Sequence, residues 1–180
     1  MSRITHQKGI DVIASTLADL TKLAQVVVVG AGDREMIEHL KAAQARHPGR
    51  VGLFIGFDEP LAHLVEAGAD IFLMPSRFEP CGMNQMYSQR YGTPPIANAT
   101  GGLVDTIVDD ATGDTLDGTG FLIPEVSPDA LLEGVVRALA ARSNASHWKR
   151  LQTNGMTRDF GWEPAARTYR RIYERIRPTS

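Results

Sequence analysis

The sequence lacks the features on which several classes of protein depend. It contains a single cysteine, Cys81, so no disulfide bond can form within the chain, and a lone thiol is typical of a reducing compartment. It has no basic surplus, with a net charge of -2, so nucleic acid is not an expected partner. The longest apolar runs, such as residues 26–29, are far too short to cross a bilayer, so no membrane association is expected. A soluble globular domain remains, and 180 residues suffice to bury a core.

Metal-ligand patterns and a signal peptide are also missing. Neither Cys-x-x-Cys nor His-Glu-x-x-His occurs, so no metal or other cofactor is expected. The histidines lack ligand spacing, and we interpret all of them as structural or surface residues: His6, His39, His47, His63 and His147. The first nine residues contain no apolar signal core.

Short apolar segments alternate with amphipathic ones along the chain. The apolar segments are nearly continuous, which is typical of parallel strands buried on both faces. Strands are predicted at residues 25–29, 51–55, 71–74, 95–97 and 120–123. Helices are predicted at residues 10–23, 33–47, 60–67, 82–91 and 128–141, with Asp33 as an N-cap. This alternation predicts an α/β fold, a Rossmann-like doubly wound parallel sheet flanked by helices.

The two ends of the chain have patterns of their own. Residues 145–177 are predicted to be helical with a break near Gly161, after which residues 162–173 carry an apolar stripe. We therefore divide the chain into a domain of residues 1–160 and a C-terminal helix of residues 161–180. At the other end, residues 2–4 resemble the end of a strand, although such a sheet normally has a complete strand before its first helix. We expect the chain to be part of a larger protein.

Four polar segments follow predicted strands, and they point to a binding site. Because the carboxyl ends of parallel strands meet at one edge, we expect these segments to form one crevice. Two of them carry glycine at a strand-to-helix turn, where backbone N–H groups and the helix N-terminus favour an anion. Arg3 and Lys8 bring full positive charges to the same crevice. The pattern predicts a diphosphate site that needs no metal. The segments are residues 2–9, 56–59, 75–85 and 98–103.

Five motifs, most of them in or next to these segments, resemble the bacterial glycogen synthase and plant starch synthase family. They are Ser-Arg-x-Thr-x-Gln-Lys-Gly at 2–9, Pro-Ser-Arg-Phe-Glu-Pro-Cys-Gly at 75–82, Gln85-x-Tyr87, Tyr91-Gly92-Thr93-x-Pro95 and Thr-Gly-Gly-Leu-x-Asp-Thr at 100–106. Their order and spacing match, and the similarity covers nearly the whole chain. The family consists of retaining glycosyltransferases with two Rossmann-like domains facing a cleft, the GT-B architecture. This chain resembles the C-terminal domain only.

The resemblance implies a reaction and its participants. The family transfers glucose from ADP-glucose to the 4-hydroxyl at the non-reducing end of an α-1,4-glucan, with retention at the anomeric carbon. ADP-glucose and ADP would bind this domain, while the N-terminal domain would hold the acceptor glucan, so this chain alone is expected to be inactive. The helix of residues 161–180 would cross to that N-terminal domain. The compartment would be the cytoplasm of a bacterium or the plastid stroma of a plant.

Three catalytic residues are expected by this resemblance. Arg3 and Lys8 would neutralise the donor diphosphate and stabilise the charge that grows on the leaving ADP. Glu79 would hold the glucosyl ring through a hydroxyl, beside the backbone N–H groups of Cys81 and Gly82. The alternatives are a solvated Arg/Lys pair and a carboxylate that only complements a helix dipole. Because no nucleophile is well placed, we favour attack on the same face, with the departing phosphate oxygen taking the acceptor's proton.

Further residues are expected to bind the substrate. Phe57 would lie against adenine, the alternative being ordinary core packing. Met83 and Asn84 would pack beside the nucleotide, where many family members have Leu and Thr. Cys81 would line the sugar pocket, the alternatives being a nucleophile or, more simply, a small buried residue.

The remaining expected binding residues lie after the strand at 95–97 and within the helix predicted at 82–91. Thr100, Gly101 and Gly102 would face the diphosphate, with Thr100 as an alternative helix N-cap. Tyr87 is included as a substrate-binding residue, although related transferases carry a second Glu there and its ribose-binding role does not transfer to a tyrosine. Two other functions stay open: another GT-B hexosyltransferase, and a non-catalytic module that binds a nucleotide or a glucan.

Overall fold

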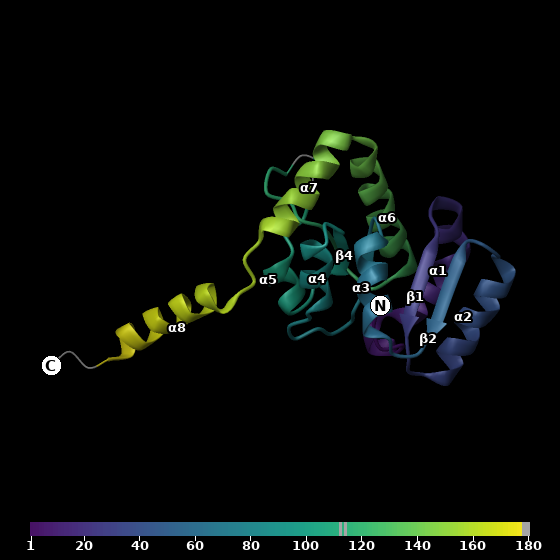
Figure 1. The fold of residues 1–180 in the computed structure, drawn as a ribbon, viewed down its shortest axis with the longest axis horizontal. Helices are drawn as coiled ribbons and strands as arrows, with labels where there is room; N and C mark the ends of the chain where they lie inside the picture. The colour runs from purple at the N-terminus through teal and green to yellow at the C-terminus, as the bar shows by residue number, and fades with distance from the viewer. Residues whose placement is uncertain (112, 114, 178–180) are drawn as a thin grey trace.

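Strands and helices alternate along the chain in the predicted order. The computed structural model describes residues 1–177 except 112 and 114, and within them five parallel strands alternate with α-helices (Figure 1). The strands are β1 (Val26–Gly30), β2 (Val51–Ile55), β3 (Phe72–Met74), β4 (Pro95–Asn98) and β5 (Phe121–Ile123). The helices are α1 (Ile10–Leu23), α2 (Arg34–Arg46), α3 (Glu59–Gly68), α4 (Asn84–Arg90), α5 (Gly102–Thr106), α6 (Pro128–Ser143), α7 (Ala145–Thr157) and α8 (Trp162–Ile176), and the 3-10 turn η1 (His6–Lys8) precedes α1. The predicted α/β fold class is confirmed.

Hydrogen bonds join the strands into two groups. β1 and β2 pair in parallel, from Val26 opposite Val51 to Gly30 opposite Ile55. β4 lies between β3 and β5 and pairs in parallel with both. Within the described part of the chain, no ladder joins β1 to β3. The predicted sheet is therefore present as a two-stranded and a three-stranded part.

The division follows from the course of residues 2–4. The N–H of Ser2 donates to the carbonyl of Val29 at 3.1 Å, and the N–H of Ile4 donates to that of Ala31 at 2.8 Å. These residues do behave as the end of a parallel strand, as predicted. They meet β1 only at its carboxyl end, however, and leave the rest of that edge open.

The buried core fixes the strands against helices on their faces. Fully buried apolar side chains come from α1, β4, β5 and α6, and include Leu17, Leu20, Ile96, Phe121 and Leu131. Removing each such side chain from water contributes about 1.5–3 kcal/mol. Helices α1 and α6 also pack against each other. The carboxyl ends of the strands, where the predicted site lies, are thereby held in place.

Helix capping explains where several elements begin. The side chain of Asp33 accepts a hydrogen bond from the N–H of Met36 at 3.0 Å, which confirms Asp33 as the N-cap of α2. Helix α4 begins at Asn84 rather than at Gly82 as predicted, because Gly82 has a φ of 71° and lies outside the helix. Helix α5 was not predicted. Five residues are too few to show a helical period.

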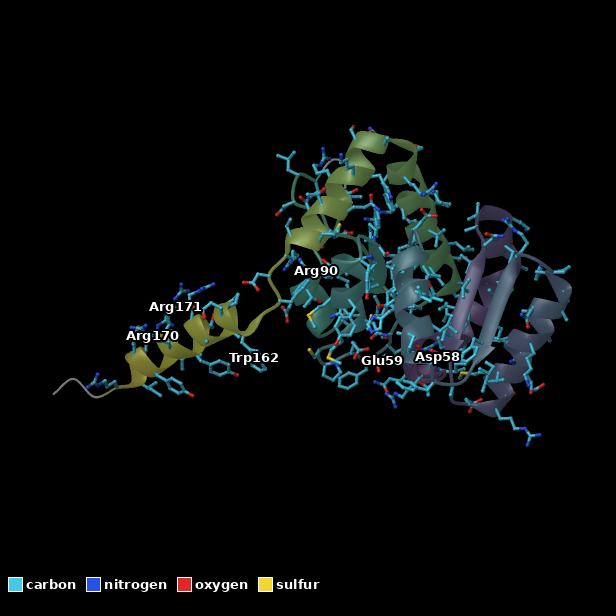
Figure 2. The ribbon with its side chains drawn as sticks, viewed as in Figure 1. Asp58, Glu59, Arg90, Trp162, Arg170 and Arg171 are labelled. Atoms are coloured by element: carbon cyan, nitrogen blue, oxygen red, sulfur yellow. The ribbon has the colours of Figure 1, made fainter. Side chains whose placement is uncertain are left out.

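Helix α8 extends away from the rest of the molecule (Figure 1). None of its residues is buried, and its apolar stripe is exposed, with Trp162 at 86% and Tyr173 at 64% of full exposure. Figure 2 shows Trp162 on one side of the helix and Arg170 and Arg171 on the other. The alternative that this stripe docks on the chain's own sheet is wrong. Residues 178–180, at the end of the predicted C-terminal helix, lie outside the described residues.

No helix among the residues that the structure describes is long and apolar enough to cross a membrane.

Gly9 provides a test of how closely the backbones pack beneath the site. Its φ is 68°, and a Cβ there would lie 2.0 Å from the carbonyl oxygen of Pro75. Gly49 has a similar φ of 73°, but a Cβ there would meet no atom within 4 Å. We predict that Gly49→Ala lowers the free energy of unfolding by about 1–2 kcal/mol through its backbone conformation alone. Gly9→Ala should lower the free energy of unfolding by the same backbone contribution and by roughly 2 kcal/mol more, because its Cβ would also collide with Pro75.

Urea unfolding of the two variants separates these contributions. Equal losses at the two positions would contradict the close approach of Gly9 to Pro75.

Candidate functional site

Three of the four predicted segments meet at one edge of the structure. They are residues 2–9, 75–85 and 98–103. The N–H of Arg77 donates to the carbonyl of Gln7 at 2.9 Å, and the amide of Gln7 donates back to the carbonyl of Phe78 at 3.1 Å. The prediction holds for these three segments, whereas the fourth, residues 56–59, does not line the cavity at this edge.

At the centre of the edge, Lys8 and Glu79 form an ion pair. The Nζ of Lys8 donates to Oε2 of Glu79, and the two side chains are only 15% and 8% exposed. Ser76 Oγ donates to the same carboxylate oxygen at 3.3 Å. An ammonium has three donors, so Lys8 can hold the carboxylate and still offer hydrogen bonds to a second anion. The pair therefore places a cation and an acceptor side by side.

The backbone around Glu79 is fixed from two directions. The N–H of Gly102 donates to the carbonyl of Glu79 at 3.0 Å. Gly101 has a φ of 48°, and a Cβ there would lie 2.1 Å from that carbonyl oxygen. Asn98, at the end of β4, donates its side-chain amide to the carbonyl of Ser76 at 3.1 Å. Glycine at position 101 is therefore required for α5 to approach the carboxylate loop this closely.

A second ion pair, which the sequence analysis missed, attaches the loop after β3 to α1. Both terminal nitrogens of Arg77 bond Asp11, each at 2.7 Å, and Arg77 also donates to the carbonyl of His6 at 2.7 Å. Partial burial works to raise the pKa of Asp11, but the hydrogen bonds and charge of Arg77 outweigh it, so the pKa lies below its ordinary value. A bidentate pair of this kind fixes orientation as well as charge. The sequence offered little signal, because the two residues are 66 positions apart.

A buried amide holds the start of α4 in position. The Nε2 of Gln85 donates to the carbonyls of Cys81 and Gly82 and to Oγ1 of Thr106. Gln89 donates to the carbonyl of Thr106 at 3.0 Å. Both glutamines are fully buried, and together they bind α4 to α5. The resemblance motifs include Gln85, but its packing role becomes visible only in three dimensions.

Arg3 lies at the same edge and remains exposed to solvent. Its guanidinium donates to Oε1 of Gln7 at 3.1 Å, and Gln7 in turn bonds the residue before Glu79. A cavity of about 930 Å³ reaches this edge, and its lining includes Arg3, Lys8, Glu79, Gly82, Met83 and Asn84. The interpretation of Arg3 and Lys8 as a merely solvated pair is wrong for Lys8, which is mostly buried.

Three other predicted binding residues, Phe57, Cys81 and Tyr87, are exposed to solvent. Phe57 is 91% exposed after β2 and does not line this cavity, so the core-packing alternative is wrong. Cys81 is exposed and its thiol donates to the carbonyl of Gly82, so it is not a small buried residue. Tyr87 is 42% exposed on α4, with its hydroxyl against the sulfur of Met83.

The segment after β4 requires one correction. The N-cap of α5 is Gly101, and no side chain caps this helix, so the predicted N-cap role of Thr100 is wrong. Thr100 is half-buried, Gly101 is exposed and Gly102 is buried. Their predicted contact with a diphosphate stays a prediction. Among the described residues, no cluster of three or more His, Cys, Asp or Glu side chains is arranged to hold a metal.

The Asp11–Arg77 pair predicts a pH-dependent contribution to stability. Because the folded-state pKa of Asp11 is lowered, the contribution is present above the ordinary aspartate pKa of about 4 and is lost as the pH falls through the lowered value. Asp11→Asn should cost about 1 kcal/mol of unfolding free energy at pH 7, a modest figure because the pair is partly exposed. Urea unfolding from pH 7 to pH 3 measures the difference, which should shrink with pH.

Asp19→Asn is the matched control on the same helix. It removes an exposed contact with Lys22 at 2.6 Å and should change stability little at any pH. A cost for Asp11→Asn that stays constant down to pH 3 would contradict the charge-based account.

Comparisons with known proteins agree with this geometry. Residues 1–155 match the family described as glycosyl transferases group 1. The chain is 49% identical over 176 residues to the glycogen synthase of Nitrosospira multiformis and 48% identical over 190 residues to that of Nitrosomonas eutropha. These alignments cover 96% and 100% of the chain but only 36% and 37% of the two relatives.

A solved structure shows the same fold. The structure of this chain is similar to the catalytic domain of starch synthase IV from Arabidopsis thaliana, which was solved bound to ADP and acarbose. The TM-score is 0.84 and the sequence identity is 31%. The match covers 96% of this chain and 36% of that one. The resemblance predicted from the motifs, and the GT-B fold that it implies, are confirmed.

Proposed function

The chain belongs to the glycosyl transferases group 1 family, and from this membership we propose that it is the donor-binding domain of a glycogen synthase. The chain spans little more than a third of the glycogen synthases that it matches. The complete enzyme would transfer glucose from ADP-glucose to the 4-hydroxyl end of an α-1,4-glucan, with retention. This chain would contribute the nucleotide-sugar side of that active site.

The Lys8–Glu79 pair is the observation that carries this proposal. A nucleotide sugar presents a diphosphate, which needs cations, next to a hexose, whose hydroxyls need acceptors. The structure places an ammonium and a carboxylate in contact at the edge where parallel strands end. Glu79 would accept a hydrogen bond from a glucosyl hydroxyl, and Lys8 would face the diphosphate together with Arg3.

The same residues account for how the bond to the diphosphate would break. As the anomeric carbon separates from the phosphate oxygen, negative charge grows on the leaving ADP, and fixed cations stabilise that charge most where it develops. The acceptor's 4-hydroxyl oxygen bonds to the anomeric carbon on the same face, and its proton passes to the departing phosphate oxygen. No cysteine nucleophile is needed, and Cys81 would line the sugar pocket.

Other residues would bind the nucleotide. Asn84 donates one amide hydrogen to the carbonyl of Met1 at 2.8 Å, and its second remains for a phosphate or ribose oxygen. Met83 is 57% exposed beside it and can pack against the nucleoside. Phe57, exposed after β2, would stack on adenine, and its exposure favours that role over a packing role. Thr100, Gly101 and Gly102 would contribute backbone donors toward the diphosphate.

The acceptor side would come from outside this chain. The exposed aromatic stripe of α8 is typical of a surface that packs on another domain. We therefore expect it to contact the part of the enzyme that holds the glucan, and we expect this chain alone to bind ADP without completing transfer. Without a facing domain, water is not excluded and the acceptor is not positioned. The bacterial relatives favour the bacterial cytoplasm as the compartment.

Calorimetry with ADP tests the assignment of the cations. Lys8→Met, which keeps most of the side-chain volume, should weaken ADP binding about 10- to 100-fold, the worth of one charge-assisted contact. Arg3→Met should weaken it less, because Arg3 is exposed. Lys41→Met is the control: it removes an exposed lysine on α2, paired with Glu38, and should leave the affinity unchanged.

A double variant separates diphosphate binding from simple neutralisation of Glu79. Lys8→Met/Glu79→Gln removes both charges of the pair, so no buried carboxylate is left unpaired. The loss of ADP affinity should persist in this variant if Lys8 binds the diphosphate. Wild-type ADP affinity in the double variant would overturn the proposal. In a separate titration of the unmodified chain, tighter binding of maltooligosaccharide than of ADP would favour a glucan-binding module instead.

A further inference from the structure

Ser76, to which the proposed function gives no role, lies beside the carboxylate of Glu79. It is the second residue after β3, and it is fully buried. The backbone around it is held from two directions. The carbonyl of Ser76 accepts a hydrogen bond from the side-chain amide of Asn98 at 3.1 Å. Gly9 approaches the carbonyl of Pro75 so closely that a Cβ on Gly9 would collide with it. Ser76 therefore has a fixed position beneath the site edge.

The hydroxyl of Ser76 points at the carboxylate. Its Oγ donates to Oε2 of Glu79 at 3.3 Å, and within the described part of the chain its side chain makes no other hydrogen bond. Because Ser76 is 0% exposed, bulk water does not compete for the hydroxyl hydrogen. A buried donor without an acceptor would be costly, so the carboxylate is the partner that this hydroxyl requires.

Both protein donors reach the same oxygen of Glu79. The Nζ of Lys8 also donates to Oε2. The other oxygen, Oε1, accepts no hydrogen bond from the residues that the structure describes, yet it is not sealed from solvent. Glu79 lines the 930 Å³ cavity at the site edge, so Oε1 is the acceptor that remains for a ligand there.

Lys8 alone would not determine which oxygen of Glu79 faces the cavity. An ammonium is a compact point charge on a flexible stem, so its attraction imposes little direction. The terminal torsion of a glutamate side chain is broad, so a carboxylate that is held at one point can still turn. A second donor that reaches the same oxygen from another segment removes this freedom. Ser76 supplies that donor from the end of β3, whereas Lys8 belongs to η1.

We propose that Ser76 is a positioning residue for the sugar of the donor, because its hydroxyl turns Oε1 of Glu79 toward a sugar hydroxyl. This role rests on the proposed function, in which Glu79 accepts a hydrogen bond from the glucosyl group. It adds that one particular carboxylate oxygen binds the sugar, and that a residue without contact to the ligand sets the direction of that oxygen. A hydroxyl fits Oε1 better than a phosphate does, since the carboxylate repels an anion.

Calorimetry with ADP and with ADP-glucose tests this role, because the two ligands differ by the glucosyl group. Ser76→Ala removes the hydroxyl but leaves Glu79 paired with Lys8, so no buried charge loses its partner. The affinity for ADP should change by less than about twofold. The gain in affinity of ADP-glucose over ADP should fall roughly threefold to tenfold, because hydrogen bonds weaken steeply when they are misaligned.

Ser76→Cys keeps the test available if Ser76→Ala does not fold. It retains the shape of the side chain with a weaker donor, so its loss of the ADP-glucose gain should be smaller than that of Ser76→Ala. A full wild-type gain in both variants would overturn the proposal.

Ser88→Ala is the matched control. Ser88 is also fully buried, but its hydroxyl donates to the carbonyl of Gln85 at 3.1 Å on α4 rather than to the carboxylate. Its replacement should lower stability toward urea, as Ser76→Ala does, but leave the gain of ADP-glucose over ADP unchanged. A similar loss of that gain in both alanine variants would overturn the proposal, since a general loosening of the fold would then explain it.

A double-mutant cycle separates positioning through Glu79 from any other effect of Ser76. Glu79→Met removes both carboxylate oxygens and should lower the gain of ADP-glucose over ADP. Adding Ser76→Ala to Glu79→Met should then produce no further loss, and a further loss would contradict the proposal.

The unmodified chain distinguishes the two proposals. If it binds ADP but binds ADP-glucose no more tightly, the role of Ser76 is wrong, while ADP binding still supports the proposed function. If it does not bind ADP at all, the proposed function is contradicted, and the role of Ser76 with it.

Discussion

The contact between Lys8 and Glu79 is the interaction on which the rest of the site depends. A carboxylate that is 8% exposed requires a partner, because an unpaired buried charge is strongly destabilising. The partner comes from a segment 71 residues earlier, so the N-terminal turn and the loop after β3 are held together by charge. The backbone of Gly101 and Gly102, the amide of Asn98 and the Asp11–Arg77 pair all serve to keep this contact in place. A site that holds a cation and an acceptor in fixed positions suits a ligand that carries both an anion and hydroxyls.

Much of the fold was accessible from the sequence, because local patterns carry it. Continuous apolar runs located all five strands to within one residue or so, and the periodicity of α1 and the cap at Asp33 located two helices. The division of the sheet into two groups was not predicted in that form. It depends on how far residues 2–4 reach along β1, and nothing in the local sequence specifies that distance.

The site was predictable in its location but less so in its supports. Glycine turns and charged residues after strands identified the edge at which Lys8 and Glu79 meet. The supporting contacts of Gln85 and of Asp11 with Arg77 were not predicted, since they join residues whose proximity arises only from packing. For Phe57 and Cys81, the alternative to a binding role was that the side chain is buried in the protein. The structure exposes both residues, because an apolar or small residue type does not by itself determine burial.

The described residues leave the aromatic stripe of α8 exposed, and the cavity beside β1 reaches the edge that we assign to the nucleotide sugar. A crystal structure of this chain with ADP tests that assignment most directly. The account predicts that the diphosphate lies within hydrogen-bond distance of Lys8 Nζ while Lys8 keeps its contact with Glu79. A diphosphate bound elsewhere, with the Lys8–Glu79 pair closed and distant from it, would contradict the account.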